Sequence, residues 1–438
     1  MRANKFRIFT FVIMTVLLVS ACAGLLSACN PDGGGLGGLG GLGGNGGGDG
    51  DTTLVFMAYA PANEQAKSIY ADILKAFTAE TGINVKPIFV PKDNYNTKLT
   101  SNFKTKNNKP DVFYLDQPIL ADYVNQCLQL DEGFFAAEGE EGLKKSDFFS
   151  AAMDTAVYNG KTYAVPFSLT SSVLLYNKTL VKNVPTNWNA WKNMSVPSET
   201  ALFGGIGAGG YASWYFQAFL KSAGGEMVKN KKAAFNSAEA VKAAQMVADL
   251  YAKSPKNVRE TTNAFATGKV MFQLAHSADI VNLYSANPTW CAENMGATLF
   301  IPETEGGVSY SNIGGENLAI RKDSGKEEQA KKLVKFLLRE ENISKIIGSN
   351  FAAIKSIAKV PTTDPVTGGA YSEVVKAALA VVLQQLDTAS ARPAVKGWAK
   401  VNDQHLANAL ADIIDNGADI QAALNTAVAG AERVLEFE

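Results

Sequence analysis

A tract of almost pure glycine near the N-terminus limits what the chain on either side of it can fold into. Between Gly33 and Gly50 the residues other than glycine are three leucines, one asparagine and one aspartate. This composition cannot bury enough apolar surface to offset the conformational entropy that folding removes. We therefore expect a Gly-rich tether over residues 29–50 and a folded part that begins at Asp51.

Residues 1–28 have the composition of a lipoprotein signal peptide. Basic residues precede an apolar stretch, and small residues followed by a cysteine end it twice, at Cys22 and at Cys29. The sequence LSAC favours Cys29 as the lipid anchor, with Cys22 as the alternative. The sequence argues against an uncleaved membrane-spanning anchor, because small residues interrupt the run before about 20 apolar residues accumulate. Either anchor holds the folded part at the cell membrane, on the extracytoplasmic side.

Length and composition favour two lobes and exclude some partners. The part over residues 51–438 is too long for one ordinary domain. The whole chain carries 41 basic and 42 acidic side chains with no basic stripe, so we expect no nucleic-acid partner. Only Cys127 and Cys291 are left as thiols in the folded part. Cys127 shares a helical stripe with apolar neighbours, so we expect a core thiol rather than a disulfide to Cys291.

Strand-like and helix-like segments alternate along the folded part, which is typical of an α/β protein. The expected early elements are strands at 53–59 and 83–90, a segment at 110–116 that leads through a third strand, a helix with one apolar face over 66–77 that Gly82 ends, and a helix from Pro118 through Cys127 to Leu128. Farther along we expect strands at 163–167 and 173–176 joined by the polar segment 168–172, and a helix to Tyr251 that Asn236 and Glu239 open as a capping box.

Several short motifs follow one another in an order that is informative as a set. They are AYA at 58–60, PDV at 110–112, GKTYAVP at 160–166, LYNK at 175–178, PTNW at 185–188, AFATGK at 264–269, GGENLAI at 314–320 and the helix at 328–338. In this order they resemble the family 1 extracellular solute-binding proteins, the lipoprotein or periplasmic receptors of ABC importers. The best-known members bind maltose and other oligosaccharides.

The resemblance implies a two-lobed, periplasmic-binding-protein-like fold of type II, with hinge-linked lobes around a ligand cleft. Lobe one would comprise residues 51–166 and 301–350, and lobe two residues 167–300 and 351–438. It also implies a carbohydrate ligand, a membrane permease as partner and, in our interpretation, a monomer. One departure concerns the site: Ala275-His276-Ser277 replaces an aromatic residue that sugar binders of the family usually carry after this strand.

Sugars select aromatic side chains, which stack on the C–H faces of a pyranose ring, and planar polar groups, which bind its hydroxyls. Alignment of the motifs gives these candidate ligand-binding residues: Tyr59, Glu64, Asp116, Tyr176, Tyr211, Trp214, Tyr215, His276, Glu316, Asn317, Arg392 and Trp398. Alternatives stay open for some of them. Trp214 fits the core face of a helix equally well, and Arg392 can simply pair with a carboxylate. Asp111 is more consistent with a brace for its own loop.

A competing motif is GIGAGG at 205–210, which satisfies the dinucleotide fingerprint. Its context is wrong, because the preceding apolar run is short and the follow-on acidic residue, Glu226, lies in a polar turn. We identify no catalytic constellation, metal site or cofactor motif, so we expect a binding protein and no enzyme. The alternatives are a receptor of the same fold for a polyamine, a sugar phosphate or a metal complex, a lipid-anchored glycan hydrolase, and an adhesin or purely structural lipoprotein.

Overall fold

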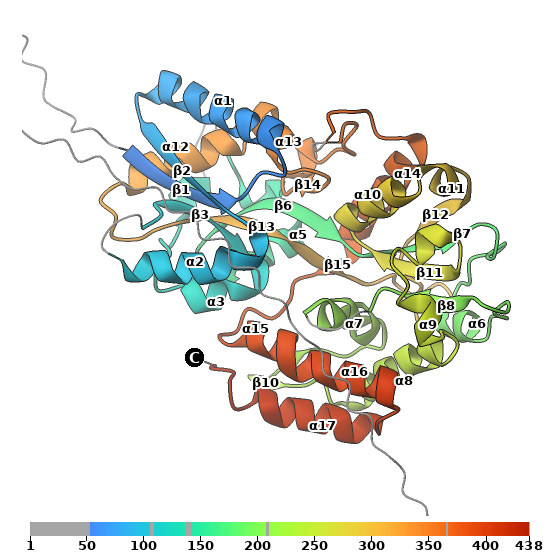
Figure 1. Ribbon diagram of the computed structural model, residues 1–438. Helices are drawn as coiled ribbons and strands as arrows, with labels where there is room; N and C mark the ends of the chain where they lie inside the picture. Colours follow the sequence, from blue (N-terminus) through green and yellow to red (C-terminus); the bar gives the residue numbers. More distant parts are fainter. Residues whose placement is uncertain (1–52, 106–108, 136–141, 207–209, 365–366, 438) are drawn as a thin grey trace, which may run out of the picture. The chain divides into compact units, whose positions relative to one another are not determined.

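The computed structural model describes residues 53–105, 109–135, 142–206, 210–364 and 367–437 (Figure 1). The chain divides into two units, residues 1–49 and residues 50–438, and every described residue belongs to the second. The signal peptide, the tether, Cys22 and Cys29 therefore lie outside the described residues. Within the described part, every helix is too short or too polar to span a membrane.

The first sheet has seven strands, six of them in the order β14-β6-β13-β3-β1-β2, with β15 paired to β13. β1 is parallel to β2 and β3, whereas β13 runs antiparallel to β3 and β6. The strands are β1 Thr53–Tyr59, β2 Asn84–Val90, β3 Val112–Asp116, β6 Val165–Ser171, β13 Ser311–Ile320, β14 Phe351–Ala352 and β15 Ala389–Ser390. The first two strands expected in the folded part are confirmed to within one residue, and the third, β3, lies within the expected segment 110–116.

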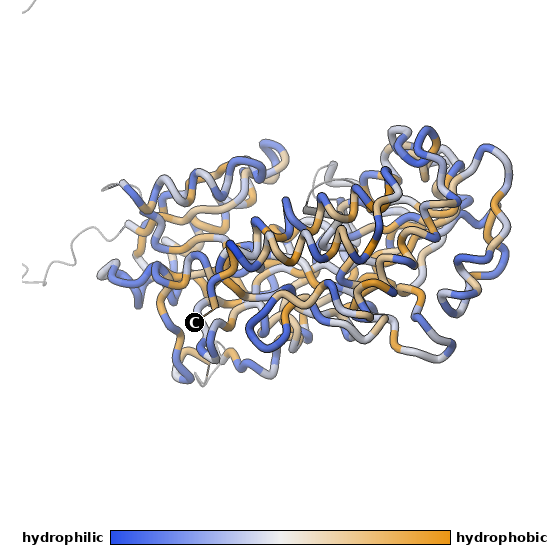
Figure 2. The backbone as a smooth tube through the Cα atoms, turned by 90° about the horizontal axis from the view of Figure 1, so that it is seen from below, coloured by the Kyte–Doolittle hydropathy of each residue, from blue (hydrophilic) through white to orange (hydrophobic). Residues whose placement is uncertain are grey.

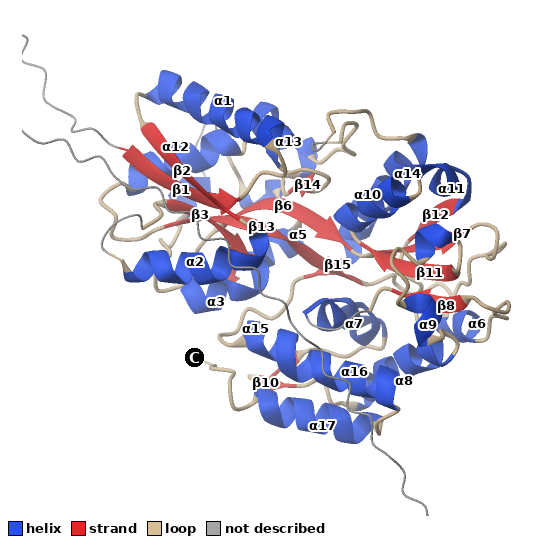
Figure 3. Cartoon of the chain, viewed as in Figure 1, coloured by secondary structure: helices blue, strands red, loops and turns tan. Residues whose placement is uncertain are grey.

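Helices cover both faces of the first sheet, with α1 on one side and α2 and α3 on the other (Figures 1 and 3). The helices around it are α1 Glu64–Thr81, α2 Lys92–Lys104, α3 Leu120–Tyr123, α4 Glu132–Phe135, α5 Ser150–Thr155, α12 Glu327–Leu337 and α13 Glu340–Ile346. A small hairpin joins β4 Val157–Tyr158 and β5 Lys161–Thr162.

The helix α1 forms for the local reasons that the sequence indicates. The side chain of Asn63 accepts a hydrogen bond from the backbone N–H of Ala66 at 2.8 Å and caps the N-terminus. Tyr70, Ile73, Leu74 and Phe77 form its buried face. Gly82 ends the helix with φ of 72°, a left-handed conformation that glycine adopts without steric cost. The helix and its stop are confirmed.

The second sheet has four strands in the order β12-β7-β11-β8. Its strands are β7 Val173–Asn177, β8 Ala201–Gly204, β11 Val270–Ala275 and β12 Met295–Thr298, and a separate hairpin joins β9 Val228–Lys229 to β10 Lys232–Ala233. The helices around it are α6 Trp188–Lys192, α7 Gly210–Ser222, α8 Ala238–Ala252, α9 Lys256–Arg259, α10 Ser277–Ala286, α11 Pro288–Asn294, α14 Glu373–Gln385, α15 Trp398–Lys400, α16 Ala407–Asn416 and α17 Ile420–Ala431.

Two hydrophobic clusters form the core: one extends from the first sheet to one face of the second sheet, and the other covers the opposite face of the second sheet. Apolar residues concentrate in the interior of the molecule (Figure 2). The core on the α7 and α8 side of the second sheet is rich in fully buried aromatic rings, namely Trp191, Phe203, Phe216, Phe219, Phe272 and Phe300. This organisation is a two-lobed α/β fold, as expected. The predicted lobe bounds remain a prediction, although β14 pairs with β6 of the first sheet and α14 packs against β12 and β7 of the second.

The polar segment 168–172 joins the two sheets, as expected, but most of it is itself part of a strand. β6 continues to Ser171, and β7 begins two residues later. The hydroxyl of Ser172 lies 2.8 Å from the hydroxyl of Ser311, and that of Thr170 lies 2.8 Å from that of Ser277. These partners are distant in sequence, and they allow polar residues to be buried in an extended segment.

The surroundings of Cys127 and the start of α8 differ from the sequence prediction. α3 ends at Tyr123, and Cys127 lies instead in an isolated β-bridge with Arg321. Cys127 and Cys291 are both buried and free, which confirms the core thiol. The cap of α8 is Ser237, which accepts from the N–H of Ala240 at 3.3 Å, and not Asn236.

Candidate functional site

A cavity of about 380 Å³ lies between the first sheet and helices that surround the second sheet. The first sheet and its helices contribute one side, and α7, α10 and the segment after β15 contribute the other. The lining residues are Lys92, Asn96, Asp116, Pro118, Ile119, Thr170, Trp214, His276, Ala278, Gly314, Gly315, Glu316, Asn350, Arg392, Ala399, Asn402 and Asp403. Five of the twelve predicted site residues are therefore brought together: Asp116, Trp214, His276, Glu316 and Arg392.

Two of these residues sit side by side on neighbouring strands of the first sheet. Asp116 ends β3, and Glu316 is its antiparallel partner on β13. The hydroxyl of Ser168 donates a hydrogen bond to the Glu316 carboxylate. Burial raises the pKa of Glu316 above 4.5, and Asp116 adds to that shift, whereas Lys92 opposes it.

A β-bulge explains why Glu316 lines the cavity while Asn317 does not. The register of β13 against β6 shifts between these two residues. The preceding Gly315 has φ of 138°, and a Cβ there would lie 1.8 Å from the carbonyl oxygen of Ser168, so only glycine fits. Asn317 instead donates to the carbonyl of Thr155 at 3.1 Å and accepts from its hydroxyl at 3.0 Å.

An ion pair joins the first sheet to the segment that follows β15. Nη2 of Arg392 lies 3.1 Å from Oδ1 of Asp116, and the arginine side chain is only 10% exposed. A guanidinium carries five N–H donors in a planar fork, a geometry that suits sugar hydroxyls as well as carboxylates. Both the ligand role and the carboxylate pairing expected for Arg392 are thus compatible with its position.

Trp214 of α7 supplies the aromatic surface of the second lobe. It is 6% exposed, and its indole N–H points to the carbonyl of Ile313 at 3.4 Å. A Cβ on Gly314 would lie 3.2 Å from the indole ring, so the glycine lets the ring approach β13. The ring also meets the His276 imidazole edge-on, with centroids 5.6 Å apart.

His276 lies between β11 and α10, at the position where we expected an aromatic residue to be missing. It caps α10: its Nδ1 accepts from the N–H of Ala278 at 3.2 Å, and Asp279 accepts from the His276 N–H at 3.1 Å. Burial lowers its pKa, so the neutral ring is favoured, although the nearby Asp279 partly opposes the shift. Because Nδ1 is an acceptor, the proton of the neutral ring lies on Nε2.

The other predicted site residues lie away from the cavity lining. Glu64 is exposed and pairs with Lys67 at 3.3 Å, and Tyr176 packs its ring over Gly296 in the second sheet. Trp398 is 1% exposed and belongs to the second core. Tyr215 is buried, and its hydroxyl donates to Asp279 at 3.0 Å.

Tyr59 lies in a cluster of aromatic rings. The ring of Tyr59 packs edge-on against Tyr95 and Tyr114, with centroids 4.7 Å and 5.6 Å away. Burial raises its pKa well above 10.0, and the neighbouring Glu316 adds to the shift, so the phenol stays neutral behind the cavity. The side chain of Tyr211 and the loop at 207–209 lie outside the described residues.

Sequence reasoning missed several residues that line the cavity. Lys92 and Asn96 are four residues apart at the start of α2, and this helical spacing after a strand is a signal that could have found them. Asn350 precedes β14. Asn402 and Asp403 lie in a π-helix, Val401–Leu406, which no local sequence pattern predicted. Asp111, by contrast, braces its loop as expected: it pairs with Arg321 at 2.6 Å.

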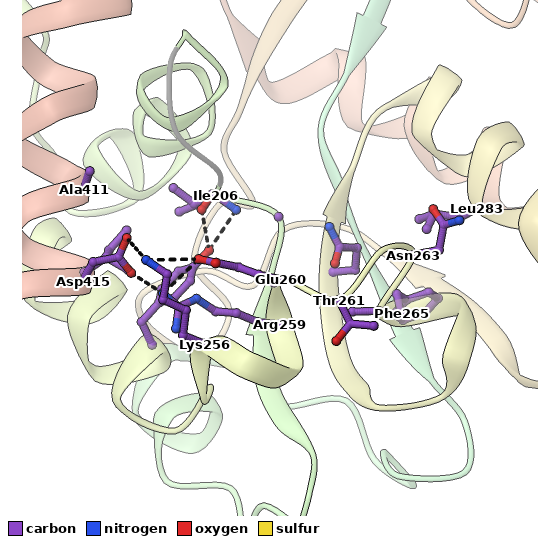
Figure 4. A pocket seen from close by; sticks show the side chains of 16 residues that line it. Ile206, Lys256, Arg259, Glu260, Thr261, Asn263, Phe265, Leu283, Ala411 and Asp415 are labelled. Carbon is purple, nitrogen blue, oxygen red and sulfur yellow. Dashed lines mark hydrogen bonds and ion pairs between the residues drawn. The ribbon is translucent and has the colours of Figure 1, made fainter. Parts of the chain in front are cut away.

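A larger cavity, of about 650 Å³, lies within the second lobe (Figure 4). Its charged side chains pair with one another: Asp415 contacts both Arg259 and Lys256, the latter at 3.1 Å. Among the residues that the structure describes, it receives none from the first sheet. We therefore take the smaller cavity as the candidate site. Among the described residues, no cluster of histidine, cysteine or acidic side chains has the arrangement of a metal site.

The family of bacterial extracellular solute-binding proteins matches residues 59–343 of the chain. The chain belongs to this family. Its members are extracellular proteins that bind solutes. Among solved structures, the chain is similar to the sugar-binding protein MalE of Xanthomonas citri, with a TM-score of 0.72 at 19% identity over 87% of this chain and 96% of that one. It is also similar to the cyclic α-maltosyl-1,6-maltose-binding protein of Arthrobacter globiformis, with a TM-score of 0.70 at 21% identity over 88% and 99%. These likenesses confirm the fold.

Two relatives that bind oligosaccharides, by their names, match this chain over 291 and 293 residues. The diacetylchitobiose-binding protein DasA of Streptomyces coelicolor is 25% identical over 62% of this chain and 66% of its own length. The maltooligosaccharide ABC transporter solute-binding lipoprotein of Streptococcus pneumoniae R6 is 25% identical over 64% of this chain and 67% of its own length. The chain thus spans about two thirds of the length of these relatives.

Proposed function

We propose that this solute-binding protein captures a carbohydrate, a mono- or oligosaccharide, between its two lobes and delivers it to the permease of an ABC importer. The observation that carries the proposal is the chemistry of the cavity between the sheets. Carboxylate, amide, hydroxyl and guanidinium groups there suit the many hydroxyls of a sugar, and Trp214 offers an indole surface beside them. Two relatives named for oligosaccharide binding support this assignment.

The capture mechanism follows from where these groups reside. Asp116 and Glu316 belong to the first sheet, whereas Trp214 and His276 belong to elements that pack on the second. A ligand that contacts both groups stabilises the state in which the lobes close on it, because it binds that state more tightly than the open one. Binding without bond cleavage is sufficient for this role, so we propose no catalysis.

We further propose that the mature protein is a monomer held at the outer face of the cell membrane by lipid on Cys29. The relative from Streptococcus pneumoniae, which is named a lipoprotein, supports an anchor of this kind. In Cys29→Ser we expect unprocessed precursor and no lipid labelling. Labelling that persists in this variant and disappears in Cys22→Ser would move the anchor to Cys22.

The experiment that tests the function is a thermal-shift screen of the chain solubilised in detergent. The panel contains maltose, maltotetraose, N,N′-diacetylchitobiose and tagatose, with spermidine, glucose 6-phosphate and a ferric chelate as competing classes. A ligand at about 100 times its dissociation constant adds roughly 2.7 kcal/mol of stability, which is readily detected. We expect a sugar to raise the melting temperature. A response confined to spermidine, glucose 6-phosphate or the chelate would show that the ligand belongs to that class and is not a sugar. Hydrolysis of an oligosaccharide would show that the protein is an enzyme.

A further inference from the structure

The candidate cavity is lined on the second-lobe side by a turn of unusual geometry. Residues Val401–Leu406 form a π-helix between α15 and α16. Such turns hold one more residue than an α-helical turn, are rare, and occur frequently at functional sites. Two consecutive residues of this turn, Asn402 and Asp403, line the cavity.

We infer that this π turn is the ligand-gripping element of the second lobe, with the Asp403 carboxylate accepting hydrogen bonds from sugar hydroxyls and Asn402 holding it in place. The inference rests on the proposed function and names residues of the same site. It goes beyond the sequence motifs, which assigned no role to either residue.

Asn402 is held firmly and orients its neighbour. It is 7% exposed, and the Ser213 hydroxyl of α7 donates to its backbone carbonyl at 2.9 Å and also to its side-chain oxygen. Its amide nitrogen then donates to Oδ1 of Asp403 at 2.6 Å. Asn402 is therefore a positioning residue whose fixed amide directs the carboxylate.

Asp403 differs from the two carboxylates on the opposite wall. Asp116 is paired with Arg392, and Glu316 accepts from Ser168. Within the part of the chain that the structure describes, Asp403 makes no ion pair, and its side chain is exposed at the cavity. An ionised carboxylate has about four acceptor positions, of which the Asn402 amide uses one. The remaining acceptors suit adjacent hydroxyls of a sugar ring.

The surrounding packing keeps the π turn in place at a cost. A Cβ on Gly430 of α17 would lie 2.4 Å from Nδ1 of His405, so the absence of a side chain there makes room for the histidine. Nε2 of His405 and the indole N–H of Trp398 are buried, and the described residues offer neither of them a hydrogen-bond partner. Buried polar groups without partners are rare and destabilising. Departures of this kind are expected where a local geometry serves function.

The test is calorimetric titration of the full-length chain in detergent with maltose, maltotetraose, N,N′-diacetylchitobiose and tagatose. For the sugar that binds wild type best, we expect Asp403→Asn and Asp403→Ala to weaken affinity by roughly 10-fold to 100-fold, the loss typical of a hydrogen bond to a charged group. Asp403 is exposed, so these variants should melt at the wild-type temperature. Asn408→Ala, at an exposed position of α16 outside the π turn, is the matched control and is expected to stay within about twofold of wild type.

The positioning role has its own readout. Gly430→Ala forces the His405 ring away and should weaken affinity while Asp403 is intact, whereas the added His405→Ala should restore it. Wild-type affinity in both Asp403 variants would overturn the inference, whatever the Gly430 variants do. If none of the four sugars binds the wild-type chain, the proposed function fails and this inference fails with it. Sugar binding by wild type thus tests the proposed function. The ratio of the dissociation constants of variant and wild type tests the role of the π turn.

Discussion

Arg392 reaches Asp116 from the segment after β15, with Nη2 3.1 Å from Oδ1, and so ties that segment to the end of β3. The pair sits in the wall of the cavity, and its arginine is 10% exposed. Hydrogen bonds to charged groups contribute about 1.5–3 kcal/mol. The pair therefore fixes the orientation of a guanidinium in the wall of the cavity where we propose that the sugar binds.

We expect Arg392→Ala and Asp116→Ala each to weaken sugar binding by about 1–3 kcal/mol. Because each residue orients the other, the double variant should lose less than the sum of the single losses. Calorimetric titration of the four proteins measures this coupling. Strictly additive losses would show that the two side chains contact the sugar independently.

Trp214 should contribute to binding through its ring surface. We expect Trp214→Phe, which keeps an aromatic ring, to weaken sugar binding by about 0.5–1.5 kcal/mol with little change in melting temperature. Trp214→Ala removes a ring that is 6% exposed and should lower the melting temperature as well. A Phe variant that binds as wild type does would reduce Trp214 to a core residue, the alternative that the sequence left open.

Trp398 should act on stability. Its ring is 1% exposed, meets Phe235 at 6.5 Å between centroids, and lies off the cavity lining. We expect Trp398→Ala to lower the free energy of unfolding by about 3–5 kcal/mol. Affinity measured well below the melting temperature should change little. A large affinity loss at unchanged stability would instead support the ligand role that the sequence predicted.

Glu316 makes stability depend on pH. Burial raises its folded-state pKa above 4.5, so the protonated form is favoured in the folded protein. The stability from this group is fully present below the unfolded-state pKa and is lost as pH rises through the higher folded-state pKa. The melting temperature of Glu316→Gln should therefore equal that of wild type at about pH 4 and exceed it at about pH 7. Equal melting temperatures at both pH values, measured by calorimetry without ligand, would contradict this account.

Local signals explain why the first lobe follows its prediction closely. The cap of α1 at Asn63 and its stop at Gly82 depend on residues within a few positions of each helix end. Asp111 was expected to brace its loop, and it does so through the Val55 N–H at 2.8 Å as well as Arg321. The ends of α1 can be predicted because the interacting residues are close along the chain, whereas for Asp111 the sequence predicted the role and not its partners, which lie 56 and 210 residues away.

Long-range partners explain most of what the sequence could not show. Thr170 and Ser172 were expected in the polar segment that joins two strands. The sequence could not show that this segment is mostly strand, because the hydroxyl partners there are Ser277 and Ser311, more than a hundred residues away. Asn317 matched the family motif as well as Glu316 did, yet the bulge at Gly315 directs the two to different surroundings.

The π turn of the candidate site could not be predicted from the sequence either. The segment around Asn402 is consistent with an ordinary helix, and the wider turn depends on Ser213 and Gly430 in other helices. Five predicted residues gather at the cavity from motif alignment, but the residues that complete it depend on tertiary packing.

The central claim is that a sugar binds in the cavity between the two lobes. Calorimetric titration of wild type, Asp116→Ala and Trp214→Phe with the sugar that gives the largest thermal shift tests it most directly. We predict saturable binding by wild type and weaker binding by both variants, one from each lobe. Wild-type affinity in both variants, or binding of spermidine or glucose 6-phosphate alone, would contradict the claim.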